Sequence, residues 1–121
     1  MSHNTMVLGV TGRQTGMIYR VPVSYSVEGT ELVCFTDAPW WKNLRRRAPV
    51  TATINGRCKS GTALAATGPI VIEHLTRHLR VVPRDAKYHA VRMGPRNEPH
   101  LGDLERAALS TAMIRVRLSE R

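Results

Sequence analysis

The sequence has few aromatic residues, two cysteines, half as many acidic as basic residues and no long apolar run. No stretch approaches the roughly 20 apolar residues of a membrane-spanning helix, which excludes a transmembrane segment and leaves only peripheral membrane contact open. Residues 1–5 have no basic flank and no apolar core, so we expect no secretory signal. Cys34 and Cys58 have no metal-binding or redox spacing and lie in apolar runs, so we expect buried free thiols in the reducing cytoplasm.

The shortage of acidic residues leaves a strongly basic chain. It has 18 Lys and Arg against 9 Asp and Glu, a formal net charge of +9. Such a charge attracts an anionic partner, whether nucleic acid, a membrane surface or a multiply charged small molecule. Most of the basic residues are arginines, which favour planar recognition of phosphate and carboxylate. The run Arg45–Arg47 fits either a solvated helix end or a group that attracts an anionic ligand.

The length and the apolar pattern predict one domain, residues 1–121, with an α+β fold that is mainly β. Alternating or continuous apolar runs predict strands at residues 6–10, 21–28, 32–35, 50–54, 57–67 and 113–118. Apolar residues at helical spacing, together with start and stop signals, predict helices at residues 40–47, 71–82, 85–93 and 104–109. We expect a sheet that curls into a small barrel, with short helices around it.

Turn residues indicate how the strands pair. Glu28-Gly29-Thr30 predicts a tight turn, and Asn55-Gly56 is the strongest hairpin signal in the chain. Pro22 has no N–H to donate, so its strand is expected to lie at a sheet edge or to be bulged there. The small residues along 57–67 indicate tight curvature or the close approach of a neighbouring strand.

The motifs of metal and hydrolase sites are not matched. His74 and His78 stand four apart, but Glu73 precedes the first histidine, so the pair predicts a polar helix face and no metal site. There is no G-x-S-x-G motif and no cysteine–histidine pair in a convincing context. Asp85 and Asp103 are interpreted as helix caps.

Two segments have the chemistry of a coenzyme site. Thr11–Gly16 is a turn with two glycines, two hydroxyls and an arginine, groups that suit a phosphate although neither a P-loop nor a G-x-G-x-x-G motif is present. Trp40 and Trp41 stand side by side at an expected helix start, which would offer indole faces to a planar ring and an N-terminus to an anion. Each segment alone is also explained as an ordinary turn or core, whereas their combination favours a planar, phosphorylated cofactor.

These segments resemble the deazaflavin-dependent nitroreductase family. The family signature runs T-G-R-[KR]-[ST]-G, then a strand with R-x-x-P or R-x-P, then W-x-x-N-L. The matching segments are Thr11–Gly16, Arg20–Tyr25 and Trp40–Arg45. Ala48–Thr51 and Asn55–Arg57 fit the family's next hairpin. Pro83–Tyr88 and the last strand are similar to one subgroup of the family. The resemblance covers most of residues 8–66.

The resemblance implies a split β-barrel like that of FMN-binding proteins, which binds the deazaflavin coenzyme F-420, with FMN as the alternative cofactor and no metal. Hydride would pass from the reduced coenzyme to a small planar acceptor such as a quinone or a nitroaromatic compound. The basic surface agrees with a coenzyme that carries several negative charges. The choice between monomer and homodimer stays open.

The resemblance also implies roles for individual residues. The coenzyme's phosphate and tail would be held by Arg13, Gln14, Thr15, Tyr19 and Arg20. The ring and its ribityl chain would be flanked by Val21, Pro22, Val23, Ser24, Phe35, Thr36, Asp37, Trp40, Trp41 and Asn43. Tyr88 would serve the acceptor side or donate a proton, and Ser24 stands where some members carry a tyrosine, so these two are the candidate catalytic residues. Gln14 replaces the family's usual lysine or arginine.

Two other functions are considered. The protein could bind the deazaflavin or FMN as a carrier without turnover, which an assay of coenzyme oxidation would distinguish. A basic nucleic-acid-binding barrel would interleave aromatic and basic residues on exposed strands. The single phenylalanine and the position of both tryptophans at a helix start disfavour it, so we expect no nucleic acid partner.

Overall fold

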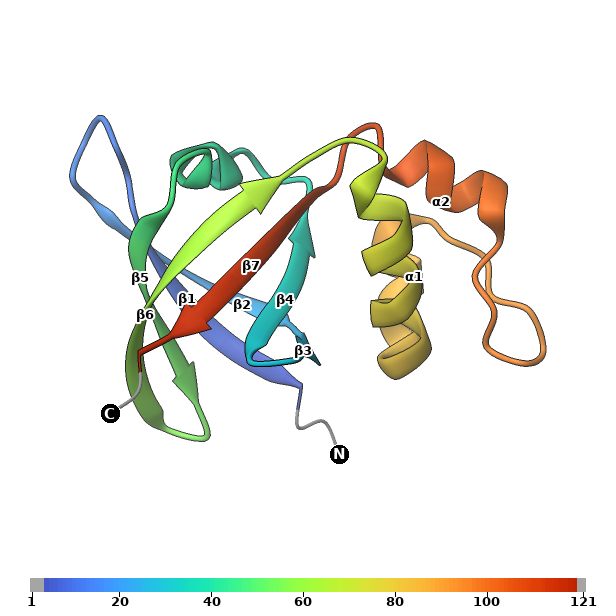
Figure 1. The fold of residues 1–121 in the computed structure, drawn as a ribbon, viewed down its shortest axis with the longest axis horizontal. Helices are drawn as coiled ribbons and strands as arrows, with labels where there is room; N and C mark the ends of the chain where they lie inside the picture. Colours follow the sequence, from blue (N-terminus) through green and yellow to red (C-terminus); the bar gives the residue numbers. More distant parts are fainter. Residues whose placement is uncertain (1–3, 120–121) are drawn as a thin grey trace.

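The computed structural model describes residues 4–119, so residues 1–3, part of the stretch where no secretory signal is expected, lie outside it. A single antiparallel sheet dominates the fold, with helices packed beside it (Figure 1). Its strands are β1 (Thr5–Thr11), β2 (Ile18–Ser24), β3 (Ser26–Glu28), β4 (Glu31–Thr36), β5 (Ala48–Ile54), β6 (Arg57–Ala66) and β7 (Ala112–Leu118). The helices are η1 (Pro39–Leu44), α1 (Ile70–Val81), η2 (Pro83–His89) and α2 (Leu101–Ala107), where η marks a 3-10 helix.

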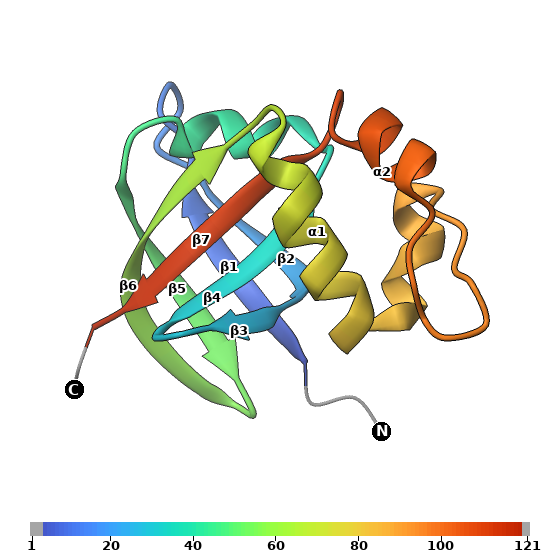
Figure 2. The same ribbon diagram turned by 45° about the vertical axis from the view of Figure 1, so that its right-hand side comes forward.

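The sheet curls into a barrel that is split on one side (Figure 2). Its strand order is β2-β1-β5-β6-β7-β4-β3, so β2 and β3 stand at opposite ends. Yet one residue, Tyr25, separates these two strands in the chain. The two edges of the sheet must therefore meet at Tyr25, which requires the sheet to curl. The predicted α+β, mainly β barrel is confirmed.

The strand expected at residues 21–28 is wrong as one element, because it breaks at Tyr25. The Tyr25 side chain is buried, and its N–H donates to the Asn4 carbonyl oxygen at 2.7 Å. Before the break β2 pairs with β1, and after it β3 pairs with β4. The alternation of apolar residues continues across the break, so the pattern alone did not reveal it.

The turn predictions are confirmed. The turn after Glu28 joins β3 to β4, and Asn55 and Gly56, with φ of 51° and 77°, join β5 to β6 as a hairpin turn with two left-handed residues requires. Pro22 belongs to the edge strand β2 and lies opposite Val7 of β1. Its missing N–H therefore removes no bond from a central ladder.

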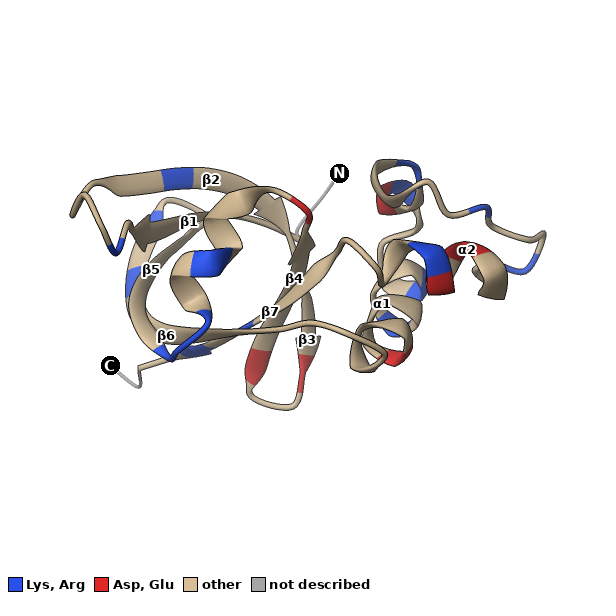
Figure 3. Cartoon of the chain, turned by 90° about the horizontal axis from the view of Figure 1, so that it is seen from above, with Lys and Arg blue, Asp and Glu red and all other residues tan. Residues whose placement is uncertain are grey.

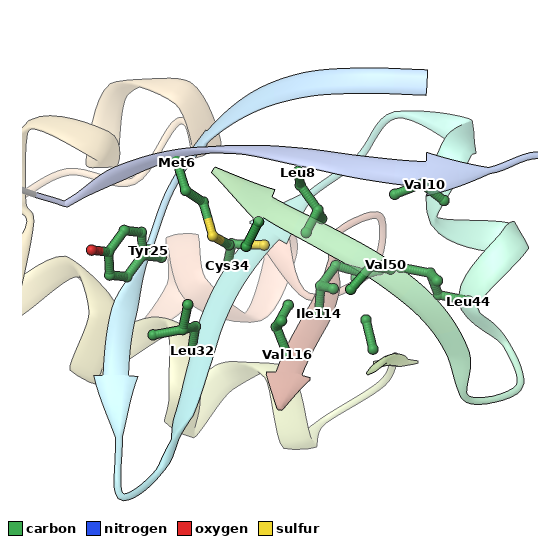
Figure 4. Close-up of a cluster of buried hydrophobic side chains, with 13 residues drawn as sticks. Met6, Leu8, Val10, Tyr25, Leu32, Cys34, Leu44, Val50, Ile114 and Val116 are labelled. Carbon is green, nitrogen blue, oxygen red and sulfur yellow. The ribbon is translucent and has the colours of Figure 1, made fainter. Parts of the chain in front are cut away.

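Two apolar clusters lie on the two faces of β4. Leu32 and Cys34 point into the barrel, whereas Val33 and Phe35 point toward the helices. This explains why the β4 sequence is a nearly continuous apolar run. The barrel interior, shown in Figure 4, is filled by residues of β1, β4, β5 and β7, including Met6, Leu8, Val10, Val50, Ile114 and Val116. The outer cluster joins the sheet to α1, η2 and α2 through Val71, Leu75, Leu79, Ala86, Leu104 and Met113.

The small residues of β6 allow β7 to lie close. A Cβ at Gly61 would collide with the backbone carbonyl oxygen of Arg117 on β7. The close approach expected along residues 57–67 is therefore confirmed at this position.

Several helix predictions need correction. The predicted helix 71–82 is present as α1, but the helix predicted at 40–47 is only the six-residue 3-10 helix η1. The helix predicted at 85–93 is replaced by the 3-10 helix η2, which ends at His89. Asp85 caps no helix and lies inside η2, while Asp103 lies inside α2, whose N-cap is His100. No helix between residues 4 and 119 is long and apolar enough to cross a bilayer.

The prediction of two buried thiols holds for only one of them. Cys34 is buried inside the barrel, whereas Cys58 is exposed. Cys58 lies on β6 opposite Thr53, on the outer side of the sheet, where no helix covers it.

Candidate functional site

A cavity of about 490 Å³ lies between β2, the end of β4, η1 and η2. We call it the β4 pocket. It is lined by Thr5, Val21, Pro22, Val23, Ser24, Phe35, Thr36, Asp37, Trp40, Asp85, Tyr88 and His89. Its volume and its mixture of aromatic, aliphatic and a few polar groups are typical of sites for small organic ligands.

Local structure at the end of β4 shapes one wall of this pocket. The Ala38 N–H donates to the Thr36 hydroxyl at 3.0 Å, which turns the chain out of the strand. Pro39 then begins η1, as its fixed φ favours. Trp40 in the first turn of η1 therefore lines the cavity together with Phe35 and residues of β2.

A second cavity, of about 510 Å³, follows the first along β2 and η1. We call it the basic pocket. It is lined by Gly12, Arg13, Gln14, Thr15, Tyr19, Lys42, Asn43 and Arg45. It has three cationic side chains and no carboxylate. Figure 3 shows basic residues on the turn between β1 and β2 and on and after η1.

Hydrogen bonds hold the walls of the basic pocket together. The Arg13 N–H donates to Asn43 Oδ1 at 3.0 Å, and Asn43 Nδ2 donates to the Trp40 carbonyl oxygen at 3.0 Å. Asn43 thus joins the glycine-rich turn to η1 across 30 residues of sequence. The turn itself closes through Gly12, whose N–H donates to the Met17 carbonyl oxygen at 2.7 Å.

The helix whose start was expected to suit an anion is the short 3-10 helix η1. η1 is too short for its backbone dipole to attract an anion strongly. Lys42 and Asn43 of η1 line the basic pocket, together with Arg45, which follows the helix. Any attraction for an anion at this place therefore comes from side chains. The Arg45 guanidinium also stacks 5.2 Å from the centre of a Trp41 ring.

A buried polar network forms the η2 side of the β4 pocket. His78 of α1 lies 2.8 Å from Asp85 Oδ2 through Nε2 and 3.0 Å from the Ser26 hydroxyl through Nδ1. All three side chains are buried. The predicted polar helix face is therefore wrong for His78, which points inward, while His74 pairs with Glu28 at 2.9 Å.

This network keeps Asp85 ionised. Burial opposes its charge, but the hydrogen bond from His78, the neighbouring Ser24 hydroxyl and the charge of Arg84 outweigh it and hold the pKa of the carboxyl below its ordinary value. At neutral pH the β4 pocket thus contains a fixed negative charge.

His89 lies at the same end of the pocket and stays neutral. Burial lowers the pKa of its imidazole, and His78 adds to this effect, against the opposing charges of Asp85 and Asp37. Its ring meets Phe35 edge to face, with centroids 6.4 Å apart. Since the neutral imidazole has one N–H donor and one acceptor nitrogen, His89 can either donate or accept a hydrogen bond.

The two pockets gather most of the residues predicted for the coenzyme site. The β4 pocket contains Val21, Pro22, Val23, Ser24, Phe35, Thr36, Asp37, Trp40 and Tyr88. The basic pocket contains Arg13, Gln14, Thr15, Tyr19 and Asn43. The predicted ring residues and tail residues thus separate into two neighbouring cavities, apart from Asn43, which lies with the tail group.

Arg20 and Trp41 line neither pocket. Successive side chains of a strand point to opposite faces, so Arg20 lies in a groove on the outer face of the sheet with Gly9 and Thr51. Trp41 follows Trp40 by one helical position and faces Thr67 and Leu109 instead.

Six lining residues were not among the individually predicted site residues. They are Thr5, Asp85 and His89 in the β4 pocket and Gly12, Lys42 and Arg45 in the basic pocket. Gly12, Lys42 and Arg45 belong to the motif segments and could have been included. Asp85 and His89 carried no signal, because their burial depends on α1 and β4. Between residues 4 and 119, no group of three His, Cys, Asp or Glu residues is placed to bind a metal ion.

Strand order and packing define this protein as a split β-barrel of the type found in flavin-binding proteins. No protein-family model and no curated protein matches its sequence. Solved structures do match. A protein of unknown function from Agrobacterium tumefaciens is 16% identical with a TM-score of 0.64, and the match covers 98% of this chain and 49% of that one. The chain therefore spans about half the length of this relative.

Two further structures extend the comparison. A FAD-binding protein from Mesorhizobium loti is 16% identical with a TM-score of 0.56, covering 97% of this chain and 80% of that one. A candidate 5-nitroimidazole antibiotic resistance protein from Bacteroides thetaiotaomicron is 14% identical with a TM-score of 0.57, covering 98% and 74%. Identities this low establish the shared fold.

Proposed function

We propose that this protein is an oxidoreductase that binds the deazaflavin coenzyme F-420 and transfers hydride to a small planar acceptor, a quinone or a nitroaromatic compound. The observation that carries the proposal is the order of the two pockets. One has aromatic and aliphatic walls that suit a planar ring, and the next is lined by three cationic side chains without a carboxylate. A planar ring with an anionic tail matches that arrangement.

In this proposal the two pockets have separate tasks. Trp40 and Phe35 pack against the ring, with Val21 and Val23 on the strand side. Arg13, Lys42 and Arg45 would hold the phosphate and the acidic tail by charge-assisted hydrogen bonds. The bound coenzyme in its reduced form would supply the hydride.

Ser24 and Tyr88 stay the candidate catalytic residues. Ser24 lies at the end of β2 near Asp85, where a hydroxyl can orient an acceptor. Tyr88 lines the same pocket but is 70% exposed, so its hydroxyl stands at the rim. A proton donated from this rim is readily replaced from solvent.

Two alternatives have support of their own. The FAD-binding structural neighbour favours a flavin such as FMN in the same two pockets. The exposure of Tyr88 favours a coenzyme carrier without turnover, because a tyrosine that water reaches so freely is poorly held against a reacting ring.

Thermal unfolding with F-420, FMN or NADPH compares the cofactors directly. A ligand at a hundredfold its dissociation constant adds about 2.7 kcal/mol to the free energy of unfolding. Lys42→Ala should reduce this gain, whereas Lys59→Ala, an exposed lysine on β6 outside both pockets, should not. No stabilisation by either kind of flavin would refute the proposal.

Turnover separates the enzyme from the carrier. We expect reduced F-420 to lose hydride, with recovery of the oxidised coenzyme's absorbance, when menadione or a nitroaromatic compound is added with the protein. Coenzyme binding without oxidation above the background rate would favour the carrier.

A further inference from the structure

The β4 pocket differs from the rest of the molecule in its charge. The chain has a formal net charge of +9, yet no described Lys or Arg lines this pocket. Its two lining carboxylates are those of Asp37 and Asp85. Asp85 is buried beside His78, and its carboxyl has a pKa below the ordinary value. The pocket is thus an acidic cavity in a basic protein.

Asp37 lines this cavity without a competing partner. It follows the last residue of β4 and precedes η1, and it is exposed. Among residues 4–119 its carboxylate forms no hydrogen bond and no ion pair. The neighbouring Thr36 hydroxyl, in contrast, is committed to the turn, because it accepts from the Ala38 N–H. A ligand in the pocket therefore meets a carboxylate that no described protein group neutralises.

His89 provides a second acceptor at the same end of the pocket. The charges of Asp37 and Asp85 both act on its imidazole, which stays neutral because burial lowers its pKa. The described part of the chain forms no hydrogen bond with the His89 ring. The ring nitrogens are nevertheless accessible, since no buried, unpaired nitrogen is found at His89. One nitrogen of a neutral imidazole is a hydrogen-bond acceptor.

These groups favour one sign of charge on a ligand. Asp37 and His89 both offer acceptors, whereas the described lining has no cationic side chain to pair with an anion. Charges interact more strongly in a partly enclosed cavity than in bulk water, because the effective dielectric is lower. A ligand with a positively charged nitrogen gains an ion pair and brings N–H donors, whereas a carboxylate meets repulsion. The net charge of the whole protein would favour the opposite order.

We propose that Asp37 is a specificity-determining residue and that the β4 pocket selects a planar acceptor with a positively charged nitrogen substituent. The inference rests on the proposed function, because it names the class of acceptor that the same site takes. It also separates the tasks of the two pockets further. The basic pocket attracts the anionic part of the coenzyme, and the β4 pocket disfavours anionic acceptors.

Three nitroaromatic ligands of similar shape test this selection at pH 7. 4-Nitrobenzylammonium, 4-nitrobenzyl alcohol and 4-nitrobenzoate share one ring and differ in charge. Nitroaromatic rings quench indole fluorescence, and in Trp41→Phe the remaining tryptophan is Trp40, which lines the pocket. Titration of the full chain with oxidised F-420 bound, which has no hydride to transfer, measures each affinity. We expect the ammonium ligand to bind about tenfold more tightly than the carboxylate, from one attraction and one repulsion of the size typical of exposed charges.

Three variants assign the preference to Asp37. Asp37→Asn keeps the size of the side chain and removes its charge, so the ratio of the ammonium to the carboxylate affinity should fall about threefold or more. Asp37→Glu should retain most of the preference. Glu105→Gln removes an exposed carboxylate of α2 outside the pocket and should leave the ratio unchanged.

The possible outcomes separate this inference from the proposed function. A wild-type ratio of one or less would overturn the selection and leave the proposed function standing, and this measurement needs no change at Asp37. An unchanged ratio in Asp37→Asn would overturn the assignment to that residue. Failure of both F-420 and FMN to bind would overturn the proposed function, and the same titration of the free chain would then decide the role of Asp37.

Discussion

Gln14 shows how a single residue sets the strength of the basic pocket. It lies in that pocket with Arg13, Lys42 and Arg45, at the position where the resembled family carries a cation. A fourth positive charge there would add to the attraction for a phosphorylated tail, and an acid would reduce it.

Gln14→Lys should tighten coenzyme binding by about twofold to fivefold at low salt, the range expected for one additional exposed ion pair. Fluorescence titration at low and high salt measures the effect, which should shrink as ionic strength rises. Gln14→Glu is the control of opposite sign and should weaken binding. Equal affinities for all three proteins would indicate that the tail lies elsewhere.

The two cysteines should differ sharply in reactivity. Burial raises the pKa of the Cys34 thiol to about 12, whereas Cys58 is exposed on the sheet. Since the thiolate is the reactive form, Ellman's reagent should modify Cys58 in the native protein and Cys34 only after unfolding. Cys58→Ser should abolish the native reaction. Rapid native modification of Cys34 would contradict its position inside the barrel.

His89 should contribute to the pH dependence of stability. Its pKa is lowered in the folded state, mainly by burial, so folding favours the neutral ring. The resulting stability is fully present above the unfolded value of about 6.5 and is lost as the pH falls through the folded pKa. His89→Gln should therefore lose less unfolding free energy between pH 7 and pH 5 than the wild type in denaturant titrations. Parallel pH profiles would show that His89 titrates normally.

At the scale of elements, the close contact of β6 and β7 depends on Gly61. The carbonyl oxygen that a Cβ would meet belongs to the backbone of Arg117, so no side chain can move to make room. β7 also pairs with β4, and a shift of β7 is therefore transmitted across the sheet.

Gly61→Ala should lower the free energy of unfolding by about 1–3 kcal/mol, as overpacking of a close-packed region does. Ser60→Ala, at the neighbouring exposed position on β6, serves as the control and should change stability little. Chemical denaturation followed by circular dichroism measures both. A stability equal to the wild type would show that the two strands separate without penalty.

At the scale of the whole molecule, the β4 pocket lies where the barrel meets the helices. Its walls come from β2, β4, η1 and η2. The outer apolar cluster fastens α1 and η2 onto β4 and β7, and it thereby positions Asp85 and His89. The integrity of the pocket thus depends on packing outside the barrel.

Leu75→Ala removes a fully buried side chain from that cluster. We expect a loss of about 2–5 kcal/mol in the free energy of unfolding, the range for such cavities. Far-ultraviolet and near-ultraviolet circular dichroism should report one coincident transition, because the helices and the sheet share this apolar cluster. Two separate transitions would show that the helices unfold independently of the barrel.

The sequence by itself determined the elements whose causes are local. Alternation and turn residues predicted most strands and the hairpins β3–β4 and β5–β6, because a turn such as Asn55-Gly56 depends on the conformations of its own residues. The motif segments likewise contained most of the residues that line the two pockets, since neighbours on one strand or turn stay together in any fold.

Only the tertiary structure decided which side chains meet. Ser26 and His78 stand 52 residues apart, and their contact required the sheet edge and α1 to pack together. The same packing buries Asp85. Tyr19 and Arg20 lie on opposite faces of β2, and the strand order decides which cavity each face borders. Such contacts depend on long-range burial and strand order, which a local pattern does not encode, and they set the polarity of the β4 pocket.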